Sequence, residues 1–179
     1  MIVLVGFMGA GKTTVGHLLA ERLGLPFTDS DEVIEQRAGR PVRQIFAEDG
    51  EPGFRALEHQ VIAGLLDGPD LVLALGGGAV EHPATRDRLA CVFVVYLQVG
   101  YEQAMQRVRG VPDPESRPLL ARPDLAATYQ RRLPLYAEIA TLTIGTDGRH
   151  PETVSQDILA RLVTEPAVGG QAPYLPPAP

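Results

Sequence analysis

Residues 6–14, "GFMGAGKTT", fit the phosphate-binding pattern GxxxxGK[ST]. Lys12 is the only lysine of the chain, and the other fifteen of its sixteen Lys and Arg residues are Arg. Arg carries a wide planar fork, whereas Lys places a compact charge on a thin stem. A position that takes Lys in a chain otherwise built with Arg therefore indicates a narrow anion site, and a glycine-rich loop around phosphate oxygens is such a site.

The surroundings of the motif support this interpretation, because an apolar run at 2–5 predicts a strand before it and the pattern of 12–24 predicts a helix after it. Backbone N–H groups can wrap around phosphates where side chains are absent, and the loop supplies Gly6, Gly9 and Gly11. We expect Lys12 to reach the β- and γ-phosphates and Thr13 to offer its hydroxyl to Mg²⁺. A glycine-rich turn without a ligand is the alternative, but the context favours a nucleoside triphosphate.

Short apolar runs alternate with amphipathic ones along the whole chain, which is typical of parallel strands joined by helical crossovers. Strands are predicted at 2–5, 26–31, 71–75, 92–97 and 141–146. Helices are predicted at 12–24, 31–39, 42–50, 51–68, 83–90, 100–110, 125–140 and 151–163, with Pro134 expected to bend or break the seventh. The expected fold is a three-layer α/β/α sandwich around a five-stranded parallel sheet, with ligands at the carboxyl ends of the strands.

Composition narrows the class of protein. The net charge of −6, without a basic block, gives no support to a nucleic-acid partner. No apolar run reaches membrane length and no basic leader precedes one, so we expect a cytoplasmic protein with no membrane association. Residues 1–164 are predicted to form a single domain and the Pro-rich residues 165–179 a disordered tail. Cys91 lies in the apolar run "CVFVVYL" and is expected to be a small core residue, with a reactive thiol as the alternative.

Two carboxylates follow the second predicted strand. Asp29 and Asp31 lie two residues apart in "TDSD", so both are directed toward the edge where ligands bind. One carboxylate could hold Mg²⁺ through water, and the other could accept a hydrogen bond or a proton from a substrate hydroxyl. Alternatively, Asp31 caps the helix that starts at Glu32.

The glycines at 76–78 and the pair Arg55 and Glu58 can each be interpreted as functional or as purely structural. "GGG" at 76–78 is either a plain turn or a place where bare backbone N–H groups approach a ligand. Arg55 and Glu58 lie three residues apart on one predicted helix face, so that Glu58 could orient the guanidinium. In so Arg-rich a chain, a solvated Arg55 is the alternative.

Taken in order, "GFMGAGKTT", "DSD", "IEQRAGRPVRQIFAEDGEPGFRALE", "LGGGAV", "RPLL" and "RRLPLY" resemble the shikimate kinases. The resemblance runs from about residue 2 to residue 163 and combines segments that other P-loop kinases do not share. It implies a monomer of the P-loop kinase type that transfers the γ-phosphoryl group of ATP, with Mg²⁺, to the 3-hydroxyl of shikimate in aromatic amino-acid biosynthesis. The "DGFPR" segment of adenylate kinases and the [NT]KxD motif of GTPases are both absent.

The resemblance also implies roles for individual residues. The catalytic residues would be Lys12, Asp31 and Arg117, the last in a lid at about 110–124. Shikimate would be bound near the helices at about 30–60 by Asp31, Arg55, Glu58 (as support for Arg55), Gly77, Gly78 and Arg132. ATP would be bound by Gly9, Ala10, Gly11, Lys12, Thr13, Thr14, Arg107, Arg117, Arg149 and Pro151. Thr13 and Asp29 would hold Mg²⁺.

Two other functions fit parts of the pattern. The first is a different small-metabolite kinase, such as a gluconate-type enzyme. The second is a nucleotide-binding regulatory module without catalysis, although the chain keeps the P-loop, both aspartates and Arg117.

Overall fold

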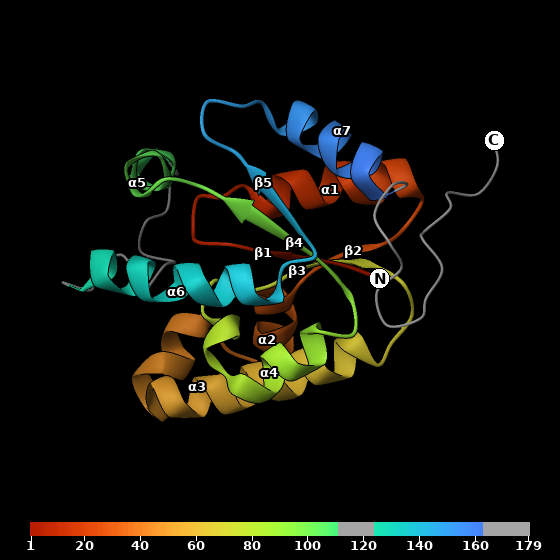
Figure 1. Ribbon diagram of the computed structural model, residues 1–179. Helices are drawn as coiled ribbons and strands as arrows, with labels where there is room; N and C mark the ends of the chain where they lie inside the picture. Colours follow the sequence, from red (N-terminus) through yellow and green to blue (C-terminus); the bar gives the residue numbers. More distant parts are fainter. Residues whose placement is uncertain (111–123, 163–179) are drawn as a thin grey trace.

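The fold is described from a computed structural model, which describes residues 1–110 and 124–162 of the 179 (Figure 1). The predicted lid around Arg117 and the predicted tail at 165–179 lie outside the described residues, so both stay predictions. The assignment of residues 1–164 to one domain also stays a prediction.

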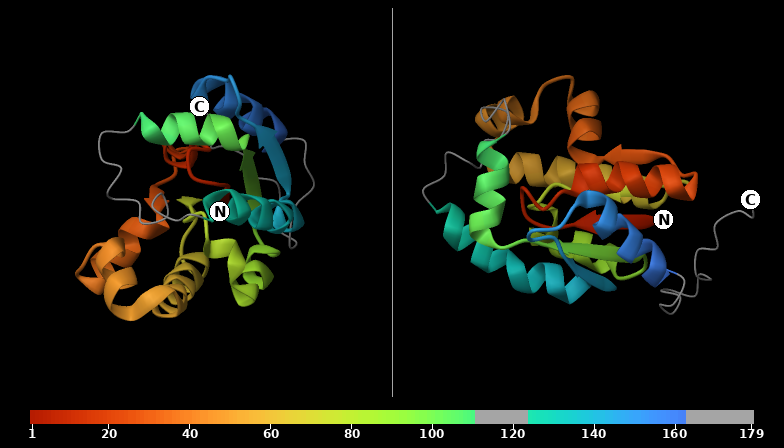
Figure 2. Two further views of the ribbon diagram at one scale, coloured as in Figure 1. Left: turned by 90° about the vertical axis from the view of Figure 1, so that its left-hand side faces the viewer. Right: turned by 90° about the horizontal axis from the view of Figure 1, so that it is seen from above.

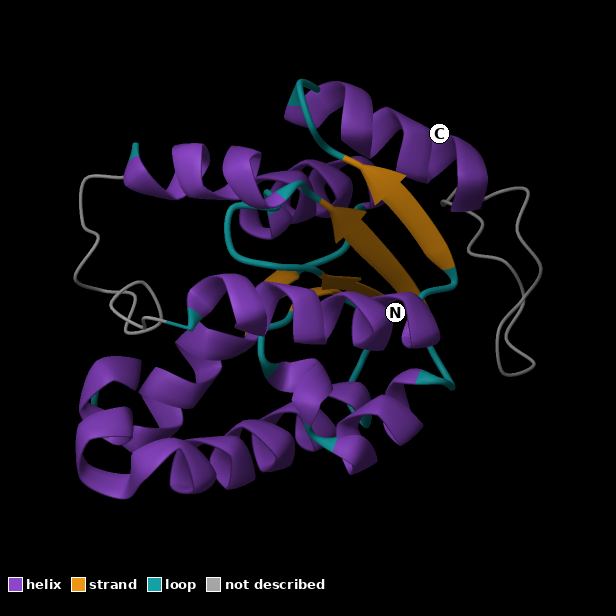
Figure 3. Ribbon diagram, turned by 60° about the vertical axis from the view of Figure 1, so that its left-hand side comes forward, coloured by secondary structure: helices purple, strands orange, loops and turns teal. Residues whose placement is uncertain are grey.

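A five-stranded parallel sheet forms the centre of the molecule, in the order β2-β3-β1-β4-β5 (Figure 3). The strands are β1 (Ile2–Val5), β2 (Phe27–Asp29), β3 (Val72–Ala74), β4 (Phe93–Gln98) and β5 (Leu142–Gly145). All five were predicted. β1 lies in the middle, where Val3 pairs with Leu73 of β3 and with Val94 of β4. Its four residues are all buried, because a central parallel strand is covered on both faces.

Helices cover both faces of the sheet and complete the predicted three layers. Figure 1 shows α1 (Lys12–Leu23) and α7 (Pro151–Leu162) side by side over one face. The other face is covered by α3 (Val42–Leu66), α4 (Pro83–Leu89) and α6 (Leu125–Ile139). The remaining helical elements are α2 (Ser30–Ala38), the 3₁₀ turn η1 (Ala79–Glu81) and α5 (Tyr101–Arg109). Within the described residues, no helix is long and apolar enough to cross a bilayer.

Two helices test the predicted interruptions, and the structure agrees with the prediction in one of them. Residues 42–50 and 51–68 were predicted as separate helices, and α3 is indeed interrupted at Gly50, whose φ of 70° and ψ of 178° are not helical. Gly tolerates this positive φ, and Pro52 then lies in the first turn of the second segment. Pro134, in contrast, does not break α6, which continues from Leu125 to Ile139.

The expectation that Cys91 is a core residue was wrong. Cys91 is exposed, because it lies in the turn between α4 and β4 rather than in the strand. The buried run begins only at Val94, one residue into β4.

The packing of α1 on the sheet requires a residue without a side chain at Gly16. A Cβ there would overlap the Phe27 ring of β2, with Cδ2 at 2.9 Å, and would lie 3.2 Å from Cδ1 of Leu4. Gly64 in α3 offers a matched site, since no atom lies within 4 Å of a Cβ built on it.

We therefore predict that Gly16→Ala destabilises the protein by about 1–3 kcal/mol through overpacking, although Ala favours a helix by about 1 kcal/mol. Gly64→Ala should instead stabilise it by up to about 1 kcal/mol. Urea unfolding measures both changes, and a Gly16→Ala variant as stable as Gly64→Ala would contradict the close contact of α1 with β2.

Candidate active site

A cavity of about 640 Å³ opens at the carboxyl edge of the sheet. It lies between the loop that follows β1, the end of β2 and the glycine turn that follows β3. Most of the predicted site residues line it: Gly9, Gly11, Lys12, Thr13, Thr14, Asp29, Asp31, Arg55, Glu58, Gly77, Gly78, Arg107 and Arg132. Ala10, Arg149 and Pro151 do not line it. One cavity thus brings together residues from opposite ends of the chain.

The P-loop forms the wall of the cavity next to α5, and Figure 2 shows α5 lying across this loop. Gly9 has a φ of 75°, and a Cβ on it would lie 2.7 Å from the carbonyl oxygen of Ala104 in α5. Both the backbone conformation and the close approach therefore require glycine. The Nζ of Lys12 donates to the carbonyl oxygens of Gly6 (2.9 Å) and Phe7 (3.2 Å), which holds the ammonium group inside the loop.

Asp29 links the P-loop to α2. Its Oδ1 accepts a hydrogen bond from the backbone N–H of Asp31 (3.0 Å), which makes Asp29 the N-cap of α2. The capping role considered for Asp31 is therefore wrong, because the helix begins at Ser30 and Asp31 lies in its first turn. The second oxygen of Asp29, Oδ2, accepts a hydrogen bond from Oγ1 of Thr13 (3.3 Å). Two hard oxygen ligands thus lie together beside the phosphate loop.

The carboxylates of Asp31, which is half-buried, and Glu58, which is buried, both lie close to Gly76. A Cβ on Gly76 would lie 2.6 Å from Oδ1 of Asp31 and 3.0 Å from Oε1 of Glu58. Burial and the neighbouring Asp29 raise the pKa of Asp31 to about 6, against the opposing influence of Lys12 and Arg55. Burial likewise raises the pKa of Glu58 to about 7, although the Arg55 guanidinium acts in the opposite direction. Both groups can therefore change protonation near neutral pH.

Two arginines from different helices meet at the glycine turn. Nη1 of Arg55 donates to Oε2 of Glu58 (2.6 Å), as the i, i+3 spacing predicted. The guanidinium lies against Gly78, where a Cβ would be 2.5 Å from its Cζ. Arg132 of α6 is only 1% exposed, and its Nη1 lies 3.7 Å from the position of a Cβ on Gly77. The glycine turn therefore makes room for both guanidinium groups.

Both arginines also have unsatisfied donors. In the part of the chain that the structure describes, the buried Nε atoms of Arg55 and Arg132 have no hydrogen-bond partner, and neither has Oε1 of Glu58. Buried polar groups are rarely left unpaired in a native protein, so the protein itself does not satisfy all the hydrogen-bonding groups of this site.

Glu81, at the end of η1, was not identified from the sequence. Its Oε2 accepts from Nη2 of Arg132 (3.0 Å) and lies 3.7 Å from Nη2 of Arg55, and its Oε1 accepts from Nη2 of Arg131 (2.9 Å). Burial alone would raise the pKa of Glu81, but the Arg132 guanidinium outweighs it and the pKa falls below its usual value. Glu81 is therefore a carboxylate. No motif or spacing links it to the arginines, so the sequence held no signal for this role.

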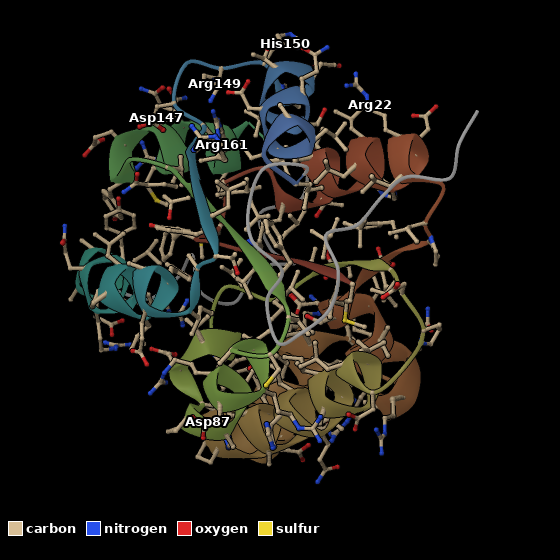
Figure 4. All side chains as sticks on the ribbon, turned by 45° about the vertical axis from the view of Figure 1, so that its right-hand side comes forward. Arg22, Asp87, Asp147, Arg149, His150 and Arg161 are labelled. Carbon is tan, nitrogen blue, oxygen red and sulfur yellow. The ribbon has the colours of Figure 1, made fainter. Side chains whose placement is uncertain are left out.

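Among the residues predicted to bind ATP outside the P-loop, Arg107 and Arg149 have different partners. Arg107 of α5 donates from Nη1 to the carbonyl oxygen of Gly9 (3.0 Å) and to Oγ1 of Thr146 (3.1 Å), so it joins the P-loop to the segment after β5. Arg149 donates from Nη2 to Asp157 (2.5 Å) and lies with His150 where α7 begins, whereas Asp147 lies beside α5 (Figure 4). Contacts of Arg149 and Pro151 with a nucleotide stay predictions.

Comparison with known proteins identifies the family. The model of the family described as "Shikimate kinase" matches residues 8–163. The chain belongs to the shikimate kinase family. The shikimate kinase of Thermobifida fusca is 48% identical over 172 residues, which are 94% of this chain and 96% of the relative. The shikimate kinase of Mycobacterium avium is 45% identical over 164 residues, covering 89% and 92%.

A solved structure agrees with the sequence comparison. The shikimate kinase from Acinetobacter baumannii in complex with shikimate has a TM-score of 0.86 and 41% identity, and the match covers 91% of this chain and 92% of that chain. The fold is thus of the P-loop kinase type, and this member of the family is an ATP-dependent kinase.

The P-loop geometry predicts that Lys12→Arg abolishes most of the kinase activity of this family member while keeping the charge. The two carbonyl oxygens that hold Nζ leave a narrow space, into which a planar guanidinium cannot enter without displacing the loop. We expect kcat/KM for ATP to fall on the order of 10²-fold or more in a steady-state ADP-release assay. Arg22→Lys, at an exposed position of the same helix, is the matched control and should be neutral. Near wild-type turnover of Lys12→Arg would contradict the steric explanation.

Proposed function

We propose that the two halves of the cavity bind ATP and shikimate next to each other, and that the γ-phosphoryl group passes to the 3-hydroxyl of shikimate. The observation that carries the proposal is the pair of arginines, Arg55 and Arg132, that line the same cavity as the phosphate loop. Family membership supports the choice of substrate, since the Acinetobacter baumannii relative was solved in complex with shikimate.

The nucleotide half is the P-loop and the first turn of α1. Backbone N–H groups of residues 9–14 and the helix N-terminus would bind the phosphates, and Lys12 would neutralise part of their charge. Arg107, which is bonded to Gly9 and Thr146, would form the adjacent wall toward the adenine. Arg149 and Pro151 would lie farther along the same wall, and Arg117 of the predicted lid would meet the transferring phosphoryl group.

Mg²⁺ would enter with ATP and be held at Thr13 and Asp29. Their oxygens lie 3.3 Å apart beside the P-loop, and Mg²⁺ in kinases is held by one or two protein oxygens together with substrate phosphates. The donor set therefore fits a metal that arrives with the nucleotide. Among the described residues, no group of three or more His, Cys, Asp or Glu side chains is placed to hold a metal ion by itself. When bound, Mg²⁺ would neutralise charge on the phosphates.

The acceptor half is formed by α2, α3, the glycine turn and α6. Arg55 and Arg132 would bind the carboxylate of shikimate, because a guanidinium matches the geometry of a planar carboxylate. The bare N–H groups of Gly77 and Gly78 would approach the same ligand. Glu58 would hold Arg55 in place through the 2.6 Å bond to its Nη1. This contact fixes the substrate at the end of its ring that does not react.

Asp31 would act at the reacting hydroxyl. It lines the cavity between Lys12 and Arg55, both of which are close enough to influence its pKa. As a carboxylate it can accept the hydrogen bond of the hydroxyl group, orient its oxygen toward the γ-phosphorus and take the proton as the bond forms. Phosphoryl transfer depends mainly on positioning and charge neutralisation, which Asp31 and Lys12 would supply from opposite sides.

The proposal is tested directly by the choice of acceptor. Coupled measurement of ADP release should show turnover that depends on shikimate, whereas gluconate and buffer alone should give only the background rate. Faster turnover with gluconate would favour the gluconate-type alternative. No turnover with either acceptor, together with normal ATP binding, would favour a regulatory module.

The raised pKa of Asp31 predicts a pH dependence. Only the ionised carboxylate can take the proton of the hydroxyl group, so kcat/KM for shikimate should fall as the pH is lowered through about 6, by up to tenfold per unit below that value. Asp31→Asn should give a low activity without this inflection. Circular dichroism at each pH controls for unfolding. A wild-type profile that stays level to about pH 5 would contradict the role of Asp31 as an acceptor in ionised form.

A further inference from the structure

Glu81 contacts the two proposed carboxylate-binding arginines from the side away from the substrate. Arg55 and Arg132 line the cavity, whereas Glu81 does not. The carboxylate of Glu81 is directed to the Nη2 atoms of both guanidinium groups, at 3.0 Å from Arg132 and 3.7 Å from Arg55. A single oxygen, Oε2, thus lies between two cations that belong to different helices.

This position gives Glu81 control over the spacing of the two arginines. Two guanidinium groups side by side repel each other, and the repulsion is strong where water is excluded. Arg132 is 1% exposed, and within the described residues Glu81 is the carboxylate at ion-pair distance from it. Removing one partner of such a buried pair leaves a charge without compensation, so the remaining side chain shifts or its surroundings rearrange.

Glu81 is itself fixed from outside by Arg131. Nη2 and Nε of Arg131 donate to Oε1 of Glu81 at 2.9 and 3.2 Å, and the Arg131 side chain is 53% exposed. The two oxygens of Glu81 therefore have separate partners: Oε1 is held at the surface and Oε2 holds the buried arginines. η1 immediately follows the glycine turn. The same short segment therefore contains the backbone of Gly77 and Gly78 and the carboxylate that contacts the two arginines.

We infer that Glu81 is a positioning residue for substrate binding, which orients Arg55 and Arg132 toward the carboxylate of shikimate. This inference rests on the proposed function, since it takes these two arginines as the carboxylate site. Glu81 touches neither substrate nor reacting atoms in this scheme. It acts through the arginines and should influence the affinity for shikimate rather than the phosphoryl-transfer step.

The negative charge of Glu81 could also oppose substrate binding. A carboxylate near an anion site also repels an anionic substrate, so removal of Glu81 would tighten binding if repulsion were the larger effect. The geometry favours orientation, because the arginines stand between Glu81 and the cavity and Glu81 bonds directly to Arg132. The sign of the change in affinity therefore distinguishes the two effects.

The test is the variant Glu81→Gln, which keeps the shape and one acceptor oxygen but removes the charge. Calorimetry without nucleotide should show shikimate binding weakened roughly tenfold or more, as expected when a buried charge pair is broken. In kinetics, KM for shikimate should rise by a similar factor, while kcat stays within about threefold and KM for ATP is unchanged.

A second measurement connects the effect to the substrate carboxylate. The wild-type protein should bind shikimate much more tightly than its carboxamide analogue, and in Glu81→Gln this preference should shrink. The matched control is Asp67→Asn, which breaks an ion pair between α3 and α4, where Arg88 donates to Asp67 at 2.9 and 3.3 Å. Asp67 does not line the cavity, so Asp67→Asn should leave both affinities unchanged.

Arg131→Gln keeps the inference testable if Glu81→Gln folds poorly. This exposed substitution loosens Glu81 without entering the cavity, and it should weaken shikimate binding about two- to threefold, the scale of an exposed ion pair. Unchanged or tighter binding of shikimate by Glu81→Gln, or by Arg131→Gln in its place, would overturn the positioning role alone. A wild-type protein that does not distinguish shikimate from the carboxamide would overturn the arginine site itself, and the inference with it.

Discussion

The close approach of three backbone segments at the end of β1 is the constraint on which the site depends. A Cβ on Gly6 would lie 2.5 Å from the carbonyl oxygen of Leu97 in β4, and one on Gly9 would lie 2.7 Å from that of Ala104 in α5. The P-loop therefore fits between β4 and α5 only as bare backbone. This contact places the carbonyl oxygens of Gly6 and Phe7 where they accept hydrogen bonds from the Lys12 ammonium group. The packing of the P-loop against β4 and α5 therefore also determines the position of the Lys12 charge.

The same edge of the sheet concentrates charges that would be unfavourable elsewhere. Asp31 and Glu58 line the same cavity, and their limited contact with water raises the pKa of Asp31 to about 6 and that of Glu58 to about 7. Arg55 compensates only in part, because it lowers both pKa values without bringing either back to its usual range. A polyanionic nucleotide would pair with Lys12, and the carboxylate of the acceptor would pair with the two arginines. The charges of the cavity are thus arranged for ligands more than for the stability of the empty protein.

Much of the fold could be predicted because its signals are local. A buried parallel strand appears as a continuous apolar run, and each of the five runs became a strand. Predictions were wrong where a neighbouring element decides the outcome. Cys91 belongs to the apolar run "CVFVVYL" but lies in the turn before β4. The break considered at Pro134 does not occur, since α6 continues through it and packs against β4 and η1. Asp31 was considered as the alternative cap of a helix starting at Glu32, whereas α2 starts at Ser30 and is capped by Asp29.

The contrast between two glutamates shows where sequence reasoning about the site ends. Glu58 lies three residues after Arg55 on one helix, so its contact follows from helical geometry and was expected. Glu81 reaches the same guanidinium from a 3₁₀ turn after a different strand, and it reaches Arg132 from across the sheet edge. Such a contact exists only after β3 has paired between β1 and β2 and α6 has packed beside η1. Sequence patterns can therefore identify a supporting group on the same helix as its arginine, such as Glu58, whereas a supporting group from another element, such as Glu81, is identified only once the tertiary fold is known.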